Sequence, residues 1–259
     1  MKVHHLNCGT MRMPTAPLVS HVLLIEASDR LVLVDTGFGH DDIADAARRL
    51  GVVRHFLRPA LDTRETAVAH IHALGLRPTD VRDIVLTHLD LDHAGGLSDF
   101  PHARVHLSAA EAHGAIHAPS WRERIRYRSS QWAHHPTIIE HNTAGESWNG
   151  FSAVEPLDDI CPGLLMIPLP GHTRGHTAYA LPAGDGQTLL HAGDAFFDHR
   201  ILTTTRQPRI LTVFETAVAS DRKQVLYNHD RLSELRDRGE PPLKLINSHD
   251  PALMPPNAS

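Results

Sequence analysis

The chain has 259 residues, with 25 Lys and Arg against 30 Asp and Glu, and 22 His. A hydrophobic content of 41% with 21% charged residues is typical of a soluble globular domain and argues against disorder. The formal net charge of −5 argues against nucleic acid or an anionic membrane surface as a partner. With no signal peptide and no apolar run that could span a bilayer, the sequence predicts a cytoplasmic protein, in which Cys8 and Cys161 are free thiols.

The first half of the chain predicts short strands separated by helices. Two apolar runs at 22–25 and 31–34 flank a polar turn, which is typical of paired strands. Ser108 followed by Glu111 predicts a capping box at the start of a later helix. The other elements expected from hydrophobic spacing are helices at 42–50 and 64–74 and strands at 83–87 and 103–107.

The second half repeats this pattern. Strands are expected at 164–169, 177–181, 188–191 and 244–247, with a turn at 184–186 and a helix at 222–238. The Pro-rich end at 251–259 predicts a loose tail. Two β-rich halves interleaved with helices indicate sheets covered by helices, and not one doubly wound parallel sheet. We expect a single domain over 1–259.

Residues 112–150 differ from the rest in composition. They contain all three tryptophans, five histidines and four arginines between 122 and 128. One interpretation is a solvated helical excursion that the tryptophans hold against the body. The other is a lid or pocket wall, because Trp and Arg supply large, directional contact surfaces. We predict a lid or pocket insertion, with the arginine run itself expected to be a solvated face.

Four potential metal ligands lie within six residues directly after the strand expected at 83–87. They are His88, Asp90, Asp92 and His93, and two glycines follow at 95 and 96. Imidazole and carboxylate groups together suit zinc, iron or manganese. The glycines permit a close approach of the backbone at the turn that follows. The spacing therefore predicts a metal site at the end of this strand.

Further His and Asp residues stand at the ends of later predicted strands. They belong to the segments Gly171-His172, Gly193-Asp194 and Ser248-His249, and an Asp35-Thr36-Gly37 turn stands upstream. This ordered set resembles the metallo-β-lactamase superfamily over nearly the whole chain. The resemblance implies an α/β fold, specifically a four-layer αββα sandwich, with a dinuclear metal site at the edge between the two β-sheets.

The resemblance also implies a role for each matching residue. His88 and His172 resemble ligands of a first metal ion, Asp92, His93 and His249 resemble ligands of a second, and Asp194 resembles the carboxylate that bridges both. Asp35 resembles a buried aspartate that orients the site through hydrogen bonds. His176 is expected to be structural. The implied cofactors are two divalent ions, with zinc expected and iron or manganese as alternatives.

One position departs from the family pattern, which usually reads His-x-His-x-Asp-His. The second histidine of that motif is Asp90 in this chain. We predict that Asp90 ligates the first metal, with altered affinity or a shift toward iron or manganese. The alternative is that Asp90 only hydrogen-bonds a metal-bound water or a neighbouring ligand.

The implied activity is hydrolysis of an ester, lactone or thioester bond of a small molecule. Metal-bound hydroxide would be the nucleophile, and Asp92 would move a proton to the leaving group while Asp194 holds the metals. The length and motif are similar to the lactonase branch, which has a substrate-contacting tyrosine three residues after the bridging aspartate. That position is Phe197 here.

Two other classes remain open at this point. One is an iron-dependent redox enzyme of the same fold, similar to the persulfide dioxygenase branch. The other is a metal- or ligand-binding module without catalysis. The sequence does not distinguish a monomer from a homodimer.

Overall fold

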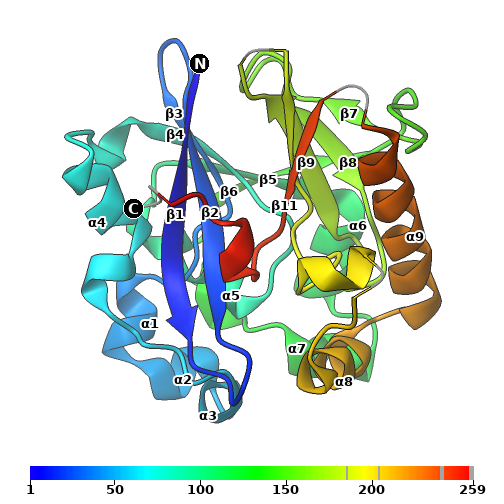
Figure 1. The fold of residues 1–259 in the computed structure, drawn as a ribbon. Helices are drawn as coiled ribbons and strands as arrows, with labels where there is room; N and C mark the ends of the chain where they lie inside the picture. Colours follow the sequence, from blue (N-terminus) through cyan, green and yellow to red (C-terminus); the bar gives the residue numbers. More distant parts are fainter. Residues whose placement is uncertain (185, 204, 240–241, 257–259) are drawn as a thin grey trace.

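The strands of the computed structural model form two sheets that face each other (Figure 1). The structure describes residues 1–184, 186–203, 205–239 and 242–256. The six-stranded sheet has the order β1-β2-β3-β4-β5-β6, and the five-stranded sheet has the order β11-β10-β9-β8-β7. The strands are β1 (Lys2–Met11), β2 (Leu18–Glu26), β3 (Leu31–Val34), β4 (Val81–Val85), β5 (Arg104–Ser108), β6 (Thr137–His141), β7 (Glu155–Pro156), β8 (Leu165–Pro168), β9 (Thr177–Pro182), β10 (Thr188–His191) and β11 (Leu243–Ile246).

The larger sheet mixes two kinds of pairing. β1, β2 and β3 pair antiparallel, whereas β3, β4, β5 and β6 run parallel to one another. Parallel neighbours bring the chain ends that follow β3, β4 and β5 to one edge of the sheet. The hairpin predicted at 22–25 and 31–34 is confirmed as β2 and β3. Strand β1 was not predicted, because its polar histidines hide the alternation of buried residues.

Hydrophobic side chains on β2 alternate between two cores, as the period of a strand requires. Leu23 and Ile25 pack between the two sheets with Met166 and Tyr179 of the smaller sheet. Val22 and Leu24 face the opposite side and belong to a core under the helices that cover the larger sheet. A third core lies between the smaller sheet and its covering helix. The fold therefore has four layers, helices–sheet–sheet–helices, which confirms the expected αββα architecture.

The helices lie on the outer faces of the sheets and at one end of the molecule. Figure 1 shows α9 along the outer side of the smaller sheet and α7 and α8 together at the end that carries the strand-to-helix loops. The α-helices are α1 (His40–Ala44), α2 (Ala46–Leu50), α3 (Val53–Leu57), α4 (Ala67–Ala73), α5 (Leu91–Ala94), α6 (Ala109–Ala112), α7 (Trp121–Arg126), α8 (Arg209–Val218) and α9 (Arg222–Arg238). Shorter turns of 3-10 type are η1 (Thr63–Glu65), η2 (Pro78–Asp80), η3 (Gly95–Asp99), η5 (Ser129–Trp132), η6 (His199–Leu202) and η7 (Pro251–Leu253), and η4 (His113–His117) is a π-helical turn.

The helix boundaries correct several predictions. The helix expected at 42–50 is two helices, because Asp45 leaves the helical conformation and its side chain accepts a hydrogen bond from the Arg48 N–H at 3.1 Å. The helix expected at 64–74 begins later, at Ala67, where the Thr66 hydroxyl oxygen caps α4. The helix at 222–238 is confirmed as α9, whereas α8 was not predicted.

The predicted tail and turn of the second half lie partly outside the described residues. The prediction of a loose tail is wrong for residues 251–253, which form η7. The turn begins at Asp250, whose side chain accepts a hydrogen bond from the Ala252 N–H. Residues 257–259 of that tail and residue 185 of the turn at 184–186 are not among the described residues. Within the part of the chain that the structure describes, no helix is both long and apolar enough to cross a membrane.

The segment 112–150 packs against the body through several elements. It contributes η4, α7, η5 and strand β6, the edge strand of the larger sheet. The buried Arg49 donates to the Ser130 carbonyl oxygen at 2.5 Å and ties the segment to α2. Trp132 and Trp148 pack against the cores, but Trp121 is 62% exposed and does not hold the segment in place. The lid role of this segment stays a prediction.

The histidine excess predicts a pH-dependent stability. Nδ1 of His5 lies 2.8 Å from Nε2 of the buried His21. Burial, and then the charges of Lys244 and His191, lowers the pKa of His5 to about 4, and burial lowers the pKa of His21 well below its usual value. Because the unfolded chain binds protons at these histidines near pH 6.5, stability is full above that pH and falls as the pH drops toward 4. Between its two pKa values, each such histidine contributes about 1.4 kcal/mol per pH unit to the slope of the free energy of unfolding against pH.

Denaturant unfolding at several pH values between 7 and 4.5 tests this prediction. In the variant His5→Gln, the free energy of unfolding is expected to fall less steeply with decreasing pH, by about the 1.4 kcal/mol per pH unit that one histidine contributes. His72→Gln, on an exposed face of α4, is expected to match the wild type. An equal pH slope in the wild type and His5→Gln would contradict it.

Candidate metal centre

The predicted ligands come from four different strand ends and meet at one edge of the two sheets. The segment from His88 to His93 follows β4, and His172, Asp194 and His249 follow β8, β10 and β11. Ligand atoms of three overlapping groups lie within 4.8 Å of one another. The groups are His88–Asp90–His172, His88–His93–Asp194 and Asp92–His93–His249. The structure therefore brings all seven predicted ligands together.

Three buried polar atoms at the middle of this cluster have no hydrogen-bond partner among the residues that the structure describes. They are Nε2 of His88, Nε2 of His93 and Oδ1 of Asp194. His93 Nε2 lies 3.3 Å from Asp194 Oδ1. Buried polar atoms rarely lack a hydrogen-bond partner, because burial removes their hydrogen bonds to water and costs free energy. A bound ligand would offset that cost. Imidazole nitrogens and a carboxylate oxygen that converge in this way fit a divalent metal ion.

The second-metal set consists of Asp92, His93 and His249 with the shared Asp194. His249 Nε2 lies 2.9 Å from Asp194 Oδ2 and 3.7 Å from Asp92 Oδ2. Burial alone would raise the pKa of Asp194, but the charges of His249 and His93 outweigh burial and hold that pKa well below its usual range. Asp194 is therefore a carboxylate, the form that ligates a metal.

The first-metal set consists of His88, Asp90 and His172 with the same Asp194. Asp90 Oδ2 lies 3.3 Å from His88 Nε2 and 3.2 Å from His172 Nε2, and His172 Nε2 lies 3.2 Å from Asp194 Oδ2. A fifth residue enters this set, because the Arg126 guanidinium pairs with Asp90. Sequence reasoning missed Arg126, which it assigned to a solvated arginine run. Burial and this guanidinium lower the pKa of His172 to about 3, so its imidazole is neutral.

Asp35 orients the centre through hydrogen bonds, as the sequence predicts. Its Oδ1 accepts from the Thr87 N–H at 2.7 Å, and its Oδ2 accepts from the Thr87 hydroxyl at 2.8 Å and from Nδ1 of His93 at 2.8 Å. The bond to Nδ1 leaves Nε2 of His93 free to face a metal. Asp35 holds this position with a φ of 60°, a conformation that few residues other than glycine adopt.

The glycines after the His-x-Asp-x-Asp-His motif permit the backbone contact that the sequence predicts. A Cβ on Gly95 would lie 2.0 Å from Asp42 Oδ2, and Gly96 N–H donates to the Gly37 carbonyl oxygen at 3.0 Å. The Thr36 hydroxyl donates to the His93 carbonyl oxygen at 2.7 Å. The motif is thus fixed against the loop that follows β3.

Glu111 is a second residue that sequence reasoning assigned wrongly. The Ser108 hydroxyl oxygen caps α6, but the Glu111 carboxylate does not return to Ser108 to complete the predicted capping box. Its Oε1 accepts from the Leu89 N–H at 2.9 Å, and its Oε2 accepts from the Thr173 hydroxyl at 2.7 Å and the Gly175 N–H at 3.1 Å. Glu111 therefore joins the loop of His88 and Asp90 to the loop of His172.

His176 has the structural role that the sequence predicts. Its Nδ1 lies 3.0 Å from the Leu169 carbonyl oxygen, and its Nε2 accepts from the Asp194 N–H at 2.9 Å. Gly193 makes this approach possible, because a Cβ there would lie 2.4 Å from His176 Nε2. The imidazole therefore fixes the backbone of Asp194.

A cavity of about 790 Å³ opens onto the centre. Its floor includes Asp90, Asp92, His172, Asp194 and His249, and its walls come from α3, α7 and α8. The rings of Phe197 and His249 lie 5.1 Å apart, and Phe197 stacks on Phe214 at 5.4 Å. The apolar residues that line it are Val52, Val53, Phe56, Leu57, Leu91, Trp121, Ile125, Phe197, Phe214, Ala217, Val218 and Ala219.

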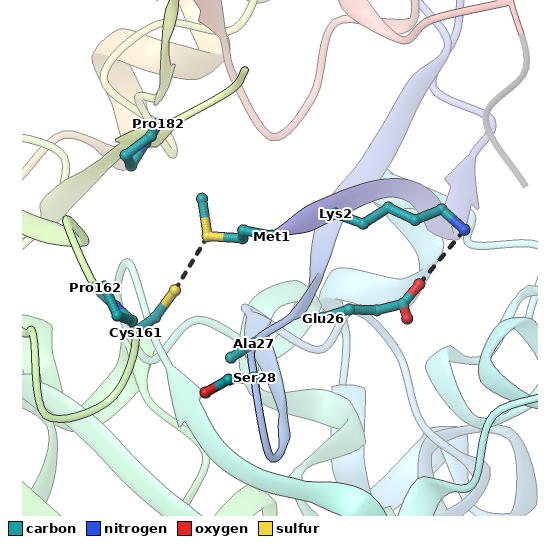
Figure 2. Close-up of a pocket in the computed structure, with 8 residues that line it drawn as sticks. All are labelled: Met1, Lys2, Glu26, Ala27, Ser28, Cys161, Pro162 and Pro182. Carbon is teal, nitrogen blue, oxygen red and sulfur yellow. Dashed lines mark hydrogen bonds and ion pairs between the residues drawn. The ribbon is translucent and has the colours of Figure 1, made fainter.

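A second cavity, of about 690 Å³, lies at the N-terminal end of β1 (Figure 2). Figure 2 shows the Cys161 thiol directed at Met1 and Lys2 paired with Glu26. The sulfur atoms of Cys161 and Met1 lie 3.2 Å apart. Both cysteines are free thiols, as predicted. Burial raises the pKa of Cys161, so the thiol is protonated and a weak nucleophile. None of the ligand clusters among the described residues includes a residue of this cavity.

The group Asp198–His199–Asp250 lies outside the centre and is satisfied internally. Asp250 Oδ2 accepts from Nδ1 of His199 at 2.6 Å, and Asp198 pairs with Arg200. These contacts are those of a structural ion-pair network and leave no reason to assign a metal there.

Fold and site together define a metallo-β-lactamase-type chain, and comparison with known sequences agrees. The metallo-beta-lactamase superfamily profile matches residues 15–249, so the chain belongs to that superfamily. A probable metallo-hydrolase of Mycobacterium tuberculosis is 51% identical over 254 residues, which are 98% of this chain and 81% of that protein. These matches place the chain among the metal-binding hydrolases.

Lactonases are further relatives. An N-acyl homoserine lactonase of Rhizobium johnstonii is 26% identical over 205 residues, 76% of this chain and 73% of that protein. A solved N-acyl homoserine lactone hydrolase, with N-hexanoyl-L-homoserine at its catalytic metal center, superposes with a TM-score of 0.72 at 20% identity. That match covers 97% of this chain and 94% of the other, and it shows a common fold.

The role of His93 as a ligand yields a direct prediction. His93→Ala is expected to lose its bound divalent metal, with an affinity loss greater than the roughly 10–100-fold seen when a residue that only supports a ligand is removed. Elemental analysis of the purified, tag-free protein measures this. The control is His72→Ala, which removes an exposed histidine of α4 and is expected to retain wild-type metal content. A His93→Ala protein with wild-type metal content would rule out this ligand role.

Proposed function

We propose that this protein hydrolyses an ester, lactone or thioester bond of a small molecule that carries an apolar group. The observation that carries the proposal is the cavity, which joins a floor of carboxylates and imidazoles to walls of apolar side chains. Such a cavity suits a substrate with one polar, reacting end and one apolar end. Lactonases among the relatives support the same bond class.

The chain supplies positioning and proton transfer at this site. A divalent ion, when bound, acidifies water and polarises a carbonyl group. Asp92, with 12% of its side chain exposed and facing the cavity, is the group that moves a proton to the leaving oxygen or sulfur. Asp194 is buried, and its carboxylate, 3.3 Å from His93 Nε2 and 2.9 Å from His249 Nε2, would hold the ion together with these two imidazoles.

Phe197 restricts how the substrate is held. Its ring packs against the imidazoles of His172 and His249, with centroids 5.8 and 5.1 Å away. A phenylalanine here donates no hydrogen bond to a substrate carbonyl oxygen. We therefore infer that apolar contact with the cavity walls, and not a phenol at this position, orients the substrate.

The proposal also covers the metal, the partner, the cellular location and the oligomeric state. Zinc is the expected metal, with iron and manganese as alternatives. A small molecule is the expected partner, the expected location is cytoplasmic, and a homodimer remains an open alternative to a monomer. The competing functions are an iron-dependent redox enzyme and a binding module without turnover.

A substrate panel with the zinc-loaded protein tests the proposal. We expect turnover of aliphatic esters, lactones or thioesters that stops when a chelator removes the metal. The kcat/KM is expected to rise by up to about fourfold for each added methylene, since a buried CH₂ contributes about 0.8 kcal/mol. Phe214→Ala is expected to weaken this chain-length preference, whereas Val213→Ala, exposed on the same helix, is expected to leave it unchanged.

Two results would contradict the proposal. Ligand binding without turnover across the whole panel would favour a binding module. Oxygen consumption by the iron-loaded protein, with no hydrolysis by the zinc-loaded protein, would favour the redox enzyme.

A further inference from the structure

The Arg126 side chain reaches from α7 into the first-metal set and uses all three of its guanidinium nitrogens there. Nε donates to Asp90 Oδ1 at 2.7 Å, and Nη2 donates to Asp90 Oδ2. Nη2 also donates to His172 Nε2 at 2.7 Å. Nη1 donates to the backbone carbonyl oxygens of His172, at 3.0 Å, and Val218. The guanidinium is thus held from two metal-site loops and from the end of α8.

Charge explains why this arginine accompanies this aspartate. The family pattern has a neutral histidine at the position of Asp90, whereas a carboxylate there adds a negative charge beside the carboxylate of Asp194. Only 18% of the Asp90 side chain and 17% of the Arg126 side chain are exposed. A buried carboxylate needs a charged, hydrogen-bonded partner, and a bidentate guanidinium provides one. The Asp90–Arg126 pair is neutral, like the histidine that it replaces.

The same contacts compete with a metal ion for its ligands. An imidazole nitrogen has a single lone pair, so His172 Nε2 cannot accept from Arg126 and ligate a metal at once. Arginine keeps its protons in proteins, so the guanidinium cannot itself become a ligand. Asp90 has further lone pairs, but the guanidinium lies against both of its oxygens and places a positive charge where an ion would approach. With His172 Nε2 engaged and Asp90 shielded in this way, the first-metal set retains only His88 and the shared Asp194. A catalytic zinc site normally has three protein ligands.

The second-metal set meets no such competitor. Arg126 contacts none of Asp92, His93 and His249 among the hydrogen bonds of the described residues. Nε2 of His93 and Oδ1 of Asp194 are buried without a hydrogen-bond partner there. The hydrogen bond of His249 Nε2, to Asp194 Oδ2 at 2.9 Å, joins two ligands of the same set, so one ion can take its place without displacing another residue.

We propose that the Arg126 guanidinium takes the place of the first metal ion in this chain. The centre then binds one divalent ion, on Asp92, His93, Asp194 and His249, and the guanidinium occupies the side of the site formed by Asp90 and His172 in place of a second ion. This replaces the expectation of two ions and of Asp90 as a metal ligand. It rests on the proposed function only in that the centre binds a metal.

Zinc stoichiometry tests this inference. The full chain is stripped of metal with a chelator, incubated with excess zinc, separated from free zinc and analysed for zinc per chain. The wild type is expected to bind about one zinc, and Arg126→Met with Asp90→His is expected to bind about two, because the change restores a neutral histidine and removes the competitor. Arg122→Met is the matched control, since Arg122 lines the same cavity without contacting a ligand, and about one zinc is expected.

The outcomes separate this inference from the proposed function. Two zinc ions in the wild type, none in the wild type, or one in a folded double variant would each overturn the inference. If the double variant does not fold, the wild-type stoichiometry decides, with the His93→Ala protein expected to bind no zinc at the centre. A wild type with one zinc and no turnover would contradict only the proposed function, and one with two zinc ions and turnover would contradict only this inference.

Discussion

The burial of carboxylates and imidazoles at the edge between the two sheets is the constraint on which this structure depends. Each of these groups loses water when the sheets pack together, so each must find a partner in the protein or in a bound ion. Asp35 and Glu111 meet this requirement by accepting hydrogen bonds from the loops that carry the ligands. Nε2 of His93 and Oδ1 of Asp194 have no hydrogen-bond partner among the described residues, and a metal ion bound between them would provide one.

Arg126 links this requirement to the segment 112–150. A single change from histidine to aspartate in the motif would leave an unpaired carboxylate next to Asp194, and the guanidinium from α7 offsets that charge. The same helix contributes Trp121 and Ile125 to the cavity wall. The wall of the cavity that would contact a substrate is therefore fixed in place at the metal centre by Arg126. A change in the charges of the centre that moved Arg126 would also change the shape of this wall.

Sequence reasoning succeeded where the signal was local and failed where the partner was distant. The ordered His and Asp motifs identified the superfamily and the residues that meet at the metal centre, and short apolar runs next to turn residues predicted β2, β3, β9 and β10. Arg126 could not be found in this way, because its partner Asp90 stands 36 residues earlier and a run of arginines has the pattern of a solvated helix face. Glu111 was misassigned for the same reason, since its partners lie on loops from both halves of the chain.

The most direct test of this account is a crystal structure of the zinc-loaded protein with anomalous diffraction recorded at the zinc absorption edge. The account predicts one anomalous peak at the centre, between Asp92, His93, Asp194 and His249, with the Arg126 guanidinium on Asp90 and His172. A second peak between His88, Asp90 and His172, with Arg126 turned away from them, would contradict it.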